Sequence, residues 1–460
     1  MNNSYRSQVI ETLKKIFKDK SYSNLVINSD IKNVDERHLS LYRKSVLGVV
    51  ENVIFIDWII NEVSNTNTKK MEMDVLIILR LAVYQLLFLD KTHENAVVNE
   101  SVQYIKDKGN IRASKFVNAV LRNTLRNKDQ LLEKLNQLPF DEYLSVKYSY
   151  PKELVKRWKS QFGKENIEEA LIANNVEAPL EIRTNTLKVT RDGLIEMLKE
   201  KGIVAKKCSY TKKGLIIENP FEIDKAEEYK NGFFSIQSES SILAGEILNP
   251  LENSFLIDMC AAPGGKTLNA AEIMNNYGKI LSRDIYKGKL PLIDKEAKRL
   301  NIDIVKTEEY DATVLDESLI EKADYIIADV PCTGLGIIRR KPEIKYKNTD
   351  EDIKNIRKIQ YKIIGNASKY LKPNGVMVYS TCTTNREENI EVINEFLKNN
   401  KGFKLVDFSE YVHESFTTAK DGFIEIYPHI HHMDGFFIAK LKRLWYNLLL
   451  FDIFLIKYIK

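Results

Sequence analysis

Residues 254–267 read SFLIDMCAAPGGKT, an apolar run that passes through small residues and two adjacent glycines into the helical segment KTLNAAEIMNN (266–276). A buried strand, a glycine turn and a helix together form the first half of a strand–helix–strand unit. Paired glycines let the backbone of such a turn approach a ligand closely. The stretch therefore predicts an α/β domain with a ligand site at the carboxyl end of this strand.

The same alternation of strands and helices continues downstream. Further strands are predicted at 279–285, 302–312, 323–331 and 375–381, with amphipathic helices among them. Near-continuous apolar strands joined by helices are typical of a parallel sheet that is covered on both faces. We therefore expect a doubly wound, Rossmann-like α/β domain over residues 236–443.

The beginning of the chain has a different pattern. Residues 1–145 contain almost no glycine or proline and show helical periodicity throughout, most clearly over 74–90 and 114–127. The segment 74–90 is apolar on nearly all sides, as the central helix of a bundle would be. We expect an all-α domain here.

Two further segments complete the predicted organisation. Residues 146–235 mix short apolar strands with helices, which predicts a small α+β domain. Residues 444–460 are apolar, but the run is short for a membrane span and is broken by polar residues. We assign no function to this C-terminal tail.

Composition narrows the class of protein. The chain has 460 residues, 44% of them hydrophobic and 29% charged, with a net charge of +5, which is typical of a multidomain globular protein. Its four cysteines are widely separated and form no CxxC motif, which argues against a zinc site and a secreted disulfide framework. The first residues lack the apolar core of a signal peptide. We expect a cytoplasmic protein with no metal and no membrane partner.

Polar residues stand where the predicted strands end, which is where parallel sheets bind ligands. Asp284 ends the second strand, 20 residues after Gly264, at the position where a carboxylate commonly holds a ribose. Asp311 lies near the end of the third strand and is placed to meet a base. The turn matches neither GxGxxG nor the P-loop, so we expect an adenosine-type cofactor rather than a dinucleotide or a triphosphate.

Two cysteines lie at the ends of the last two predicted strands. DVPCTG (329–334) contains Asp329 and Cys332, and YSTCT (379–383) contains Cys382. A single buried cysteine is usually just a small hydrophobic residue. Because these strands should be neighbours, both thiols and the carboxylate are expected to converge beside the cofactor turn, which favours a catalytic role.

A thiol beside such a cofactor suits one kind of chemistry. The C5 atom of a pyrimidine is a poor nucleophile until a thiolate adds to C6, after which C5 can attack an electrophilic methyl group. An acid near N3 eases the addition, and a base then removes the C5 proton. We therefore interpret Cys382 as a nucleophile with Asp329 beside it, and S-adenosylmethionine as the methyl donor.

Several motifs carry a resemblance to a known family. DMCAAPGGKT, DVPCTGLG and YSTCT together resemble the RNA cytosine-5 methyltransferases of the NOL1/NOP2/Sun superfamily. The helical beginning, with YQLLFLD, AVVNESV and FVNAVLRN, resembles a NusB-like RNA-binding domain. This pairing is similar to the bacterial RsmB (Sun) family of 16S rRNA cytosine-5 methyltransferases, over roughly residues 3–443. Lys115 stands where the family commonly has Gly, and Ser238 where Asp is frequent.

The resemblance implies roles for individual residues. Cys382 would be the nucleophile, and Cys332 would assist release of the product. The residues implied to hold S-adenosylmethionine are Cys260, Ala261, Ala262, Pro263, Gly264, Gly265, Lys266, Asp284, Asp311 and Asp329. The implied substrate is 16S ribosomal RNA at cytosine 967 in the usual rRNA numbering, taken as free RNA, and residues 146–235 resemble the small α+β RNA-binding module of the family. Nothing in the sequence demands more than a monomer.

Basic residues gather in two places. From Tyr104 to Lys128 there are seven lysines and arginines against one acid, and a second basic run follows Cys332. Most charge runs are solvated faces, but the resemblance favours contacts with RNA phosphates. The expected contacts are Lys115, Arg122, Arg126, Arg339, Arg340 and Lys341, with Lys345 and Lys347 as further candidates.

Three alternatives stay open. A DNA cytosine-5 methyltransferase would use the cysteine of the PC motif, Cys332, as its nucleophile. The same chemistry on RNA could act on another rRNA cytosine or on a tRNA. From a different class, the chain could be a non-catalytic ribosome-assembly or antitermination factor, which would bind RNA without turning over a cofactor.

Overall fold

The computed structural model describes residues 5–445 except Lys20, Lys91 and Pro220. The chain divides into two compact units: unit 1 comprises Met1–Val176 and Ile338–Lys347, and unit 2 comprises Glu177–Ile337 and Asn348–Lys460. The apolar tail predicted at 444–460 lies, from residue 446 onward, outside the described residues. The domain boundaries expected after residues 145, 235 and 443 stay predictions.

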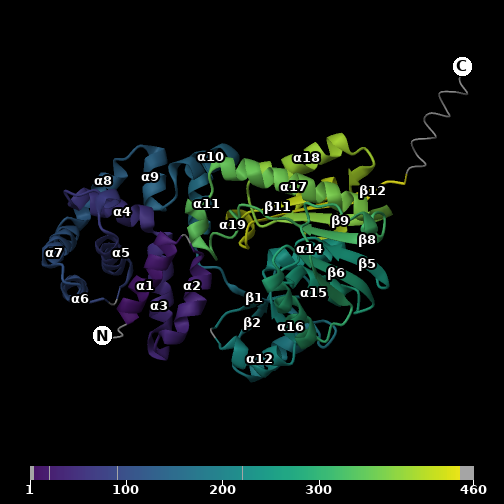
Figure 1. The fold of residues 1–460 in the computed structure, drawn as a ribbon, viewed down its shortest axis with the longest axis horizontal. Helices are drawn as coiled ribbons and strands as arrows, with labels where there is room; N and C mark the ends of the chain where they lie inside the picture. Colours follow the sequence, from purple (N-terminus) through teal and green to yellow (C-terminus); the bar gives the residue numbers. More distant parts are fainter. Residues whose placement is uncertain (1–4, 20, 91, 220, 446–460) are drawn as a thin grey trace, which may run out of the picture. The chain divides into compact units, whose positions relative to one another are not determined.

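Unit 1 is helical throughout its described residues, as the sequence periodicity predicts (Figure 1). Helix α5 packs against α1, α3, α4, α6 and α7, so it is the central helix of the bundle. Its apolar residues are buried around most of its circumference, because neighbours surround it on nearly all sides. The helices are α1 (Tyr5–Lys18), α2 (Ser23–Asp30), α3 (Leu39–Glu51), α4 (Val53–Val63), α5 (Met73–Phe88), α6 (Glu94–Asp107), α7 (Ile111–Arg126), α8 (Lys128–Asn136), α9 (Phe140–Lys147), α10 (Lys152–Phe162) and α11 (Ile167–Ala173).

Unit 2 begins with a small antiparallel sheet in the order β2-β3-β1-β4. Apolar side chains from its strands and from the helix α12 form a separate core around Ile182, Leu194 and Phe234. The sequence predicts this α+β pattern, but its apolar runs at 179–189 and 214–219 indicate only β1 and β3 of the four strands. The elements are β1 (Leu180–Thr184), α12 (Arg191–Glu200), β2 (Ala205–Lys207), β3 (Gly214–Ile217), α13 (Glu227–Lys230) and β4 (Phe234–Ile236).

The larger sheet of unit 2 has a parallel centre with an antiparallel edge. Its path is β10-β12-β9-β8-β5-β6-β7, with β11 paired to β12. The strands β9, β8, β5, β6 and β7 run parallel, whereas β12 runs antiparallel to β9, β10 and β11. The strands are β5 (Ser254–Asp258), β6 (Gly278–Asp284), β7 (Val305–Glu309), β8 (Ala323–Asp329), β9 (Leu371–Thr381), β10 (Phe403–Leu405), β11 (Phe423–Ile426) and β12 (Phe436–Arg443).

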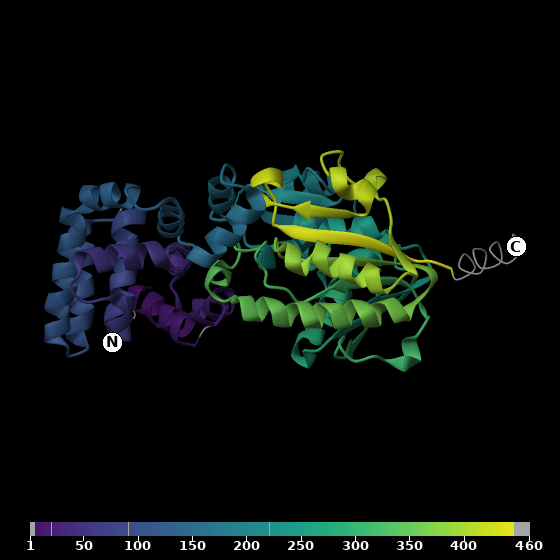
Figure 2. The same cartoon turned by 90° about the horizontal axis from the view of Figure 1, so that it is seen from above.

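Helices cover both faces of this sheet (Figure 2). One face carries a core that includes Leu256 and Val378, packed under α14 (Glu239–Leu248), α15 (Gly265–Ile273) and α16 (Leu290–Leu300). The other face carries Ile257 and Tyr379, packed under α17 (Asp350–Tyr370) and α18 (Ile390–Asn399). Neighbouring residues of one strand thus enter opposite cores, as the period of two in a strand requires.

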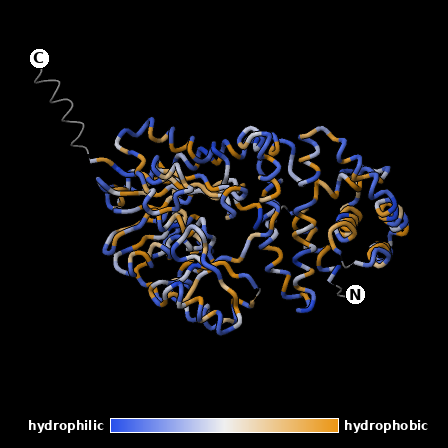
Figure 3. The backbone as a smooth tube through the Cα atoms, turned by 180° about the vertical axis from the view of Figure 1, so that it is seen from behind, coloured by the Kyte–Doolittle hydropathy of each residue, from blue (hydrophilic) through white to orange (hydrophobic). Residues whose placement is uncertain are grey.

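The hydropathy pattern agrees with this three-layer arrangement. In Figure 3 apolar stretches run along the strands at the middle of the sheet, and the helices that cover the sheet mix polar and apolar residues. No helix within residues 5–445, its three undescribed positions apart, combines the length and apolar character needed to cross a membrane. The predicted Rossmann-like fold is confirmed, with the antiparallel edge as an addition.

Candidate active site

The glycine turn after β5 is held in a defined shape by the neighbouring strand. Gly264 has φ +108°, a conformation that L residues with a side chain rarely adopt, and its N–H donates to the Ala261 carbonyl at 2.7 Å. The N–H of Ala262 donates to Asp284 Oδ2 at 3.0 Å. Asp284, at the end of β6, therefore supports the turn from the side.

A cavity of about 210 Å³ opens at this turn. Its walls come from the turn, from the chain just after β4, and from the end of β8. The lining residues are Ile236, Gln237, Ser238, Ser241, Asp258, Cys260, Ala261, Ala262, Pro263, Gly265, Lys266 and Asp329. Most of the residues predicted to bind a cofactor are thus brought to one cavity.

Asp258 was not among the predicted site residues, although it is the last residue of the strand in the opening stretch. Its side chain is buried, and Oδ2 accepts a hydrogen bond from Thr267 Oγ1 at 2.6 Å. Oδ1 has no hydrogen-bond partner within the described part of the chain. Burial raises the pKa of Asp258 to about 7. The cavity wall therefore includes a buried carboxylate with one oxygen that has no hydrogen-bond partner in the described residues.

The other predicted carboxylates lie around the same place, although Asp284 and Asp311 are not among the residues that line the cavity. Thr313 donates to Asp311 Oδ1 through its N–H and its hydroxyl, both at 2.8 Å. Burial, followed by the charges of Asp258, Asp329, Asp284 and Asp311, raises the pKa of the Cys260 thiol well above its ordinary value. Four carboxylates thus surround Cys260 at the carboxyl ends of the strands.

The two predicted thiols meet at the ends of adjacent strands. β8 and β9 are parallel neighbours, with Asp329 opposite Ser380, and the Sγ atoms of Cys332 and Cys382 lie 3.3 Å apart. The hydrogen bond with Cys382 and burial together raise the pKa of Cys332 well above its ordinary value. Cys332 is therefore protonated at neutral pH and can donate its S–H to the Cys382 sulfur.

Backbone contacts hold the two cysteine loops together. The N–H of Gly336 donates to the Cys382 carbonyl at 3.0 Å, and the N–H of Gly435 donates to the Gly336 carbonyl at 2.8 Å. A Cβ atom at Gly336 would lie only 1.9 Å from the Gly435 carbonyl oxygen. Only glycine allows this approach, so the residue is needed for the loops to meet.

Glu388 is a second residue that the sequence interpretation missed. Its buried carboxylate accepts from the Thr333 N–H at 2.8 Å, from the Thr333 hydroxyl at 2.6 Å and from Asn385 Nδ2 at 2.9 Å. Thr333 Oγ1 also lies 2.8 Å from Thr383 Oγ1. The residues that follow each cysteine are thus joined in one buried polar network. The sequence does not indicate this network, since Glu388 stands in a charged segment that is predicted to be a solvated helix.

Asp329 connects the thiol strands to the cofactor turn. Its Oδ2 pairs with Lys266 Nζ at 2.8 Å, and its Oδ1 accepts from Ser380 Oγ at 2.6 Å. Both carboxylate oxygens are therefore fixed, one by the turn after β5 and one by the end of β9. The arrangement places a charged, hydrogen-bonded group between a ligand cavity and a pair of thiols.

The basic residues fall into two groups. Lys115, Arg122 and Arg126 are exposed on α7, seven and four residues apart, and so share one face of the helix. Arg339, Arg340 and Lys341 are half-buried in the segment Ile338–Lys347, which belongs to unit 1. The ammonium group of Lys341 lies 5.7 Å from the centre of the Tyr22 ring.

Lys345 does not fit its expected role. It is only 3% exposed, donates to Asn175 Oδ1 at 2.6 Å, and lies over the Tyr150 ring at 4.1 Å. Burial lowers its pKa to about 7. The expectation that Lys345 contacts RNA phosphates is therefore wrong, because its ammonium group is occupied inside unit 1.

Comparisons with known families cover almost the whole chain. Residues 245–442 match the family model described as 16S rRNA methyltransferase RsmB/F. Residues 3–126 match the NusB family, and residues 150–224 match a ferredoxin-like domain of RsmF/B-like methyltransferases.

Individual relatives extend over the same length. The chain is 33% identical to the Bacillus subtilis (strain 168) protein named "Probable ribosomal RNA small subunit methyltransferase B", over 96% of this chain and 99% of that protein. It is 32% identical to the Homo sapiens 28S rRNA (cytosine(4447)-C(5))-methyltransferase, over 68% of this chain and 40% of that protein.

Two crystal structures are also similar. That of PH0851 has a TM-score of 0.81 at 26% identity, covering 96% of this chain and 99% of the other. That of NSun6 from Pyrococcus horikoshii with SFG has a TM-score of 0.57 at 28% identity, covering 64% of this chain and 99% of the other.

Proposed function

Because the chain belongs to the 16S rRNA methyltransferase RsmB/F family, we propose that it methylates C5 of a cytosine in 16S ribosomal RNA, at position 967 in the usual numbering. One observation carries the chemistry: the Cys332 and Cys382 sulfurs lie 3.3 Å apart, where two neighbouring strands end. The small-subunit name of the Bacillus relative supports the substrate, and the cytosine-C5 name of the human relative supports the reaction.

S-adenosylmethionine is the cofactor, and the residues around the glycine turn suit it. The unpaired Asp258 Oδ1 is an acceptor for a cationic group inside the cavity. Asp284 and Asp311, at the ends of the next two strands, would hold the ribose and the base. The bound cofactor supplies an electrophilic methyl group. Gly264 allows the left-handed turn, where a Cβ would press on Ile293, and a Cβ at Gly265 would lie 3.5 Å from Gln237 in the cavity wall.

The proposed reaction begins with Cys382. Its thiolate forms a bond to C6 of the cytosine, and the electron pair of the C5–C6 double bond becomes available at C5. In this proposal Asp329, which is held by Lys266 and Ser380, acts at N3 of the ring. After methyl transfer, a base such as water takes the proton from C5, the electron pair of that C–H bond re-forms the C5–C6 double bond, and the C6–S bond breaks with its electron pair returning to Cys382.

Cys332 would act in the second half of this reaction. Its raised pKa keeps the thiol protonated beside Cys382, so a proton donor stands next to the sulfur that has to leave. Only one thiol of so close a pair carries the charge, and the choice of Cys382 as the nucleophile follows its place in the YSTCT motif, where the family resemblance puts the attacking cysteine.

RNA would be bound through basic residues outside this centre. The exposed face of α7 with Lys115, Arg122 and Arg126 and the segment with Arg339, Arg340 and Lys341 supply positive charge for phosphates. We propose free 16S rRNA as the substrate and a cytoplasmic monomer as the active form. The same chemistry on a different rRNA cytosine or on a tRNA is the second candidate, supported by the 28S rRNA relative.

The test is a methylation assay with labelled S-adenosylmethionine and protein-free 16S rRNA, followed by mapping of the modified base. We expect one 5-methylcytosine at position 967. Label at another rRNA cytosine, or only in tRNA, would overturn the choice of substrate. No label in any RNA, despite tight RNA binding, would overturn the assignment as an enzyme.

The roles of the two thiols can be separated in the same assay. Cys382→Ala should abolish methyl transfer and leave cofactor binding unchanged. Cys332→Ala should accumulate a protein–RNA adduct that survives denaturing electrophoresis, because release is slowed while addition is not. The reverse pair of phenotypes would contradict the proposed roles and favour the mechanism in which the cysteine of the PC motif attacks.

A further inference from the structure

Arg183 on β1 is a buried charged residue to which the proposed reaction assigns no part. Neither its side chain nor that of Glu272 on α15 is exposed to solvent. Arg183 Nε donates to Glu272 Oε2 at 3.0 Å, and Nη2 donates to Oε1 at 2.8 Å. This two-bond arrangement fixes the plane of the guanidinium group. Arg183 thus joins the small antiparallel sheet to the helix that follows the cofactor turn.

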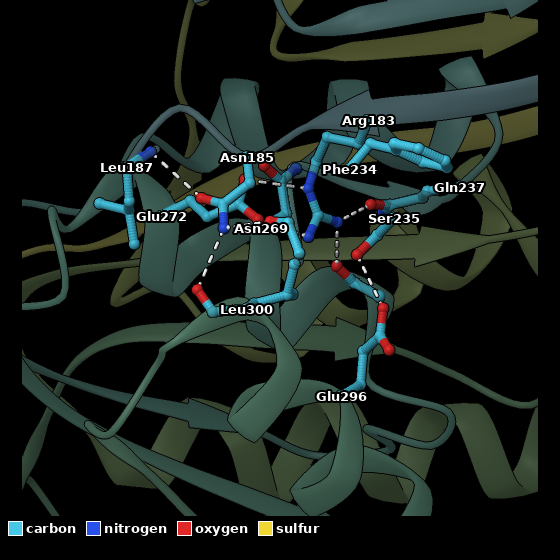
Figure 4. Close-up of polar contacts among 12 residues, drawn as sticks. Arg183, Asn185, Leu187, Phe234, Ser235, Gln237, Asn269, Glu272, Glu296 and Leu300 are labelled. Atoms are coloured by element: carbon cyan, nitrogen blue, oxygen red, sulfur yellow. Dashed lines mark hydrogen bonds and ion pairs between the residues drawn. The ribbon is translucent and has the colours of Figure 1, made fainter. Parts of the chain in front are cut away.

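The remaining guanidinium nitrogen of Arg183, Nη1, bonds to two residues of the cofactor cavity wall. Nη1 donates to the Gly265 carbonyl at 2.8 Å and also to Gln237 Oε1, as Figure 4 shows for Gln237. Gln237 and Gly265 both line the cavity, whereas Arg183 does not. Gln237 Nε2 in turn donates to Ser241 Oγ at 3.0 Å, another lining residue. One guanidinium group therefore fixes two walls of the cavity.

Stability alone does not account for this arrangement. A buried ion pair costs desolvation free energy, and apolar residues of similar size are often as stabilising or more so. A guanidinium held by Glu272 does something that apolar residues cannot, because it aims a donor at one backbone carbonyl. The geometry points to positioning of the cavity wall.

We propose that Arg183 is a positioning residue for S-adenosylmethionine. The small antiparallel sheet of unit 2 then helps to shape the cofactor cavity. This inference rests on the proposed function, since it assumes that the cavity binds this cofactor. Its consequence is that residues 236–443 do not contain the whole cofactor site. Arg183, which holds Gln237 and Gly265 in the cavity wall, lies more than 50 positions before that segment.

The test measures the affinity of the full-length protein for S-adenosylmethionine by calorimetry, without RNA or turnover. In Arg183→Lys, a single ammonium group cannot hold Glu272 through two bonds and also reach Gly265. We expect the Kd for the cofactor to rise about tenfold or more, the scale of one lost charged hydrogen bond. In a separate methylation assay of the same variant, the KM for RNA should be unchanged.

Arg299→Lys is the matched control. Arg299 on α16 pairs with Glu296 and donates to the Phe234 carbonyl at 3.0 Å and to Ser235 Oγ at 3.1 Å, so it holds the same small sheet to the catalytic fold. No hydrogen bond joins it to Gly265 or Gln237 within the described residues. We expect a lower Tm for this variant and a cofactor Kd within about twofold of the wild type.

A second variant covers the case in which Arg183→Lys does not fold. The double replacement Arg183→Met with Glu272→Met removes both buried charges at similar volume. Folded protein with weakened cofactor affinity supports positioning. An unchanged cofactor Kd in either folded Arg183 variant overturns the inference and leaves the proposed function standing. A wild-type protein that binds no S-adenosylmethionine overturns both.

Discussion

Three carboxylates organise the active site, and each acts through identified atoms. Asp258 lies in the cavity wall with an Oδ1 that has no partner in the described residues, Asp329 joins Lys266 to Ser380, and Glu388 joins Thr333 to Asn385. A buried carboxylate is costly unless it is hydrogen-bonded. Asp329 and Glu388 have hydrogen-bond partners, whereas one oxygen of Asp258 has none within the described residues.

Cofactor affinity should depend on pH through Asp258. Burial raises the pKa of Asp258 to about 7 in the ligand-free protein, and the positive charge of S-adenosylmethionine favours the ionised form. Binding therefore releases a proton below the pKa, so affinity should increase as the pH rises from about 6 to 8, by up to about tenfold per pH unit at the acidic end. Calorimetric Kd values across this range check the prediction.

Asp258→Asn is the control for this pH dependence. The variant keeps an oxygen in the cavity but cannot ionise, so its cofactor affinity should be lower and nearly constant over the same range. Because the raised pKa of Asp258 stabilises the folded state at acidic pH and this contribution is lost as the pH rises through about 7, the stability of the ligand-free protein should change less steeply in the variant. A wild-type Kd that is constant between about pH 6 and 8 contradicts the role of Asp258.

Helix α7 packs into the core of unit 1 with one face and presents positive charge on the other. Val117, Val120 and Leu121 are buried in the core of unit 1, while Lys115, Arg122 and Arg126 are exposed on the opposite side. Arg122 Nη1 donates to Asn95 Oδ1 at 3.1 Å, and Arg126 Nη2 donates to Asn123 Oδ1. Neutral amides hold these arginines in place without cancelling their charge, which leaves a positive stripe for phosphates.

Removing this charge should weaken RNA binding in a salt-dependent way. The triple replacement of Lys115, Arg122 and Arg126 by Gln should lower the affinity for 16S rRNA and reduce the slope of log K against log salt by about 2, for three lost phosphate contacts. Filter binding between low and physiological salt measures both quantities. The Kd for S-adenosylmethionine should not change.

The matched control removes the same charge from another part of unit 1. Lys15, Lys134 and Lys152 each pair with a carboxylate, namely Asp30, Glu62 and Glu142. Their triple replacement by Gln should leave the salt slope within experimental error of the wild type. Equal slopes for the two triple variants would show that the effect follows net charge rather than the α7 stripe.

The chain as a whole enters unit 1 twice. The segment Ile338–Lys347 belongs to unit 1, although the residues on both sides of it belong to unit 2. Glu343 accepts from the Ser23 N–H at 2.9 Å and from the Ser23 hydroxyl at 2.8 Å, and so caps the beginning of α2 from 320 residues away. The segment that follows the Cys332 loop in the chain, Ile338–Lys347, thus packs with the helices of unit 1.

Lys345 in this segment should make the stability of unit 1 depend on pH. Burial lowers its pKa to about 7, whereas the unfolded chain keeps the proton up to about pH 10. The unfolded state thus binds more protons in between, so the free energy of unfolding should rise with pH from about 7 to 9, by at most about 1.4 kcal/mol per unit. Urea unfolding followed by tryptophan fluorescence reports on unit 1 through Trp58 and the buried Trp158.

Two variants isolate the contribution of Lys345. Lys345→Met should unfold with a free energy that hardly changes from about pH 7 to 9, because the buried amine is gone. Lys128→Met, which changes an exposed lysine of the same unit, should keep the wild-type slope. The same slope in all three proteins would mean that Lys345 is protonated in the folded state throughout this range.

Much of the active site follows from residue order alone. Strand periodicity identifies the parallel strands, and a parallel sheet brings all their carboxyl ends to one edge. Cys332, Cys382, Asp329 and the turn at 260–266 could therefore be expected to converge, and the two sulfurs do lie in contact. The fold class, the methyltransferase family and the cofactor follow from these short motifs because each motif is local.

Arg183, Glu388 and Lys345 could not be assigned in this way. Arg183 meets Glu272 across 89 residues, Thr333 meets Glu388 across 55, and Lys345 meets Asn175 across 170. Local periodicity predicts only which face of a helix or strand is apolar. A charged residue in such a pattern is therefore predicted to be exposed to solvent. The sequence by itself determined the fold and the convergence of the two cysteines proposed to react, because those depend on the repeat of neighbouring residues. Only the tertiary structure decided which buried charges hold the site in shape, because those depend on contacts between elements distant along the chain.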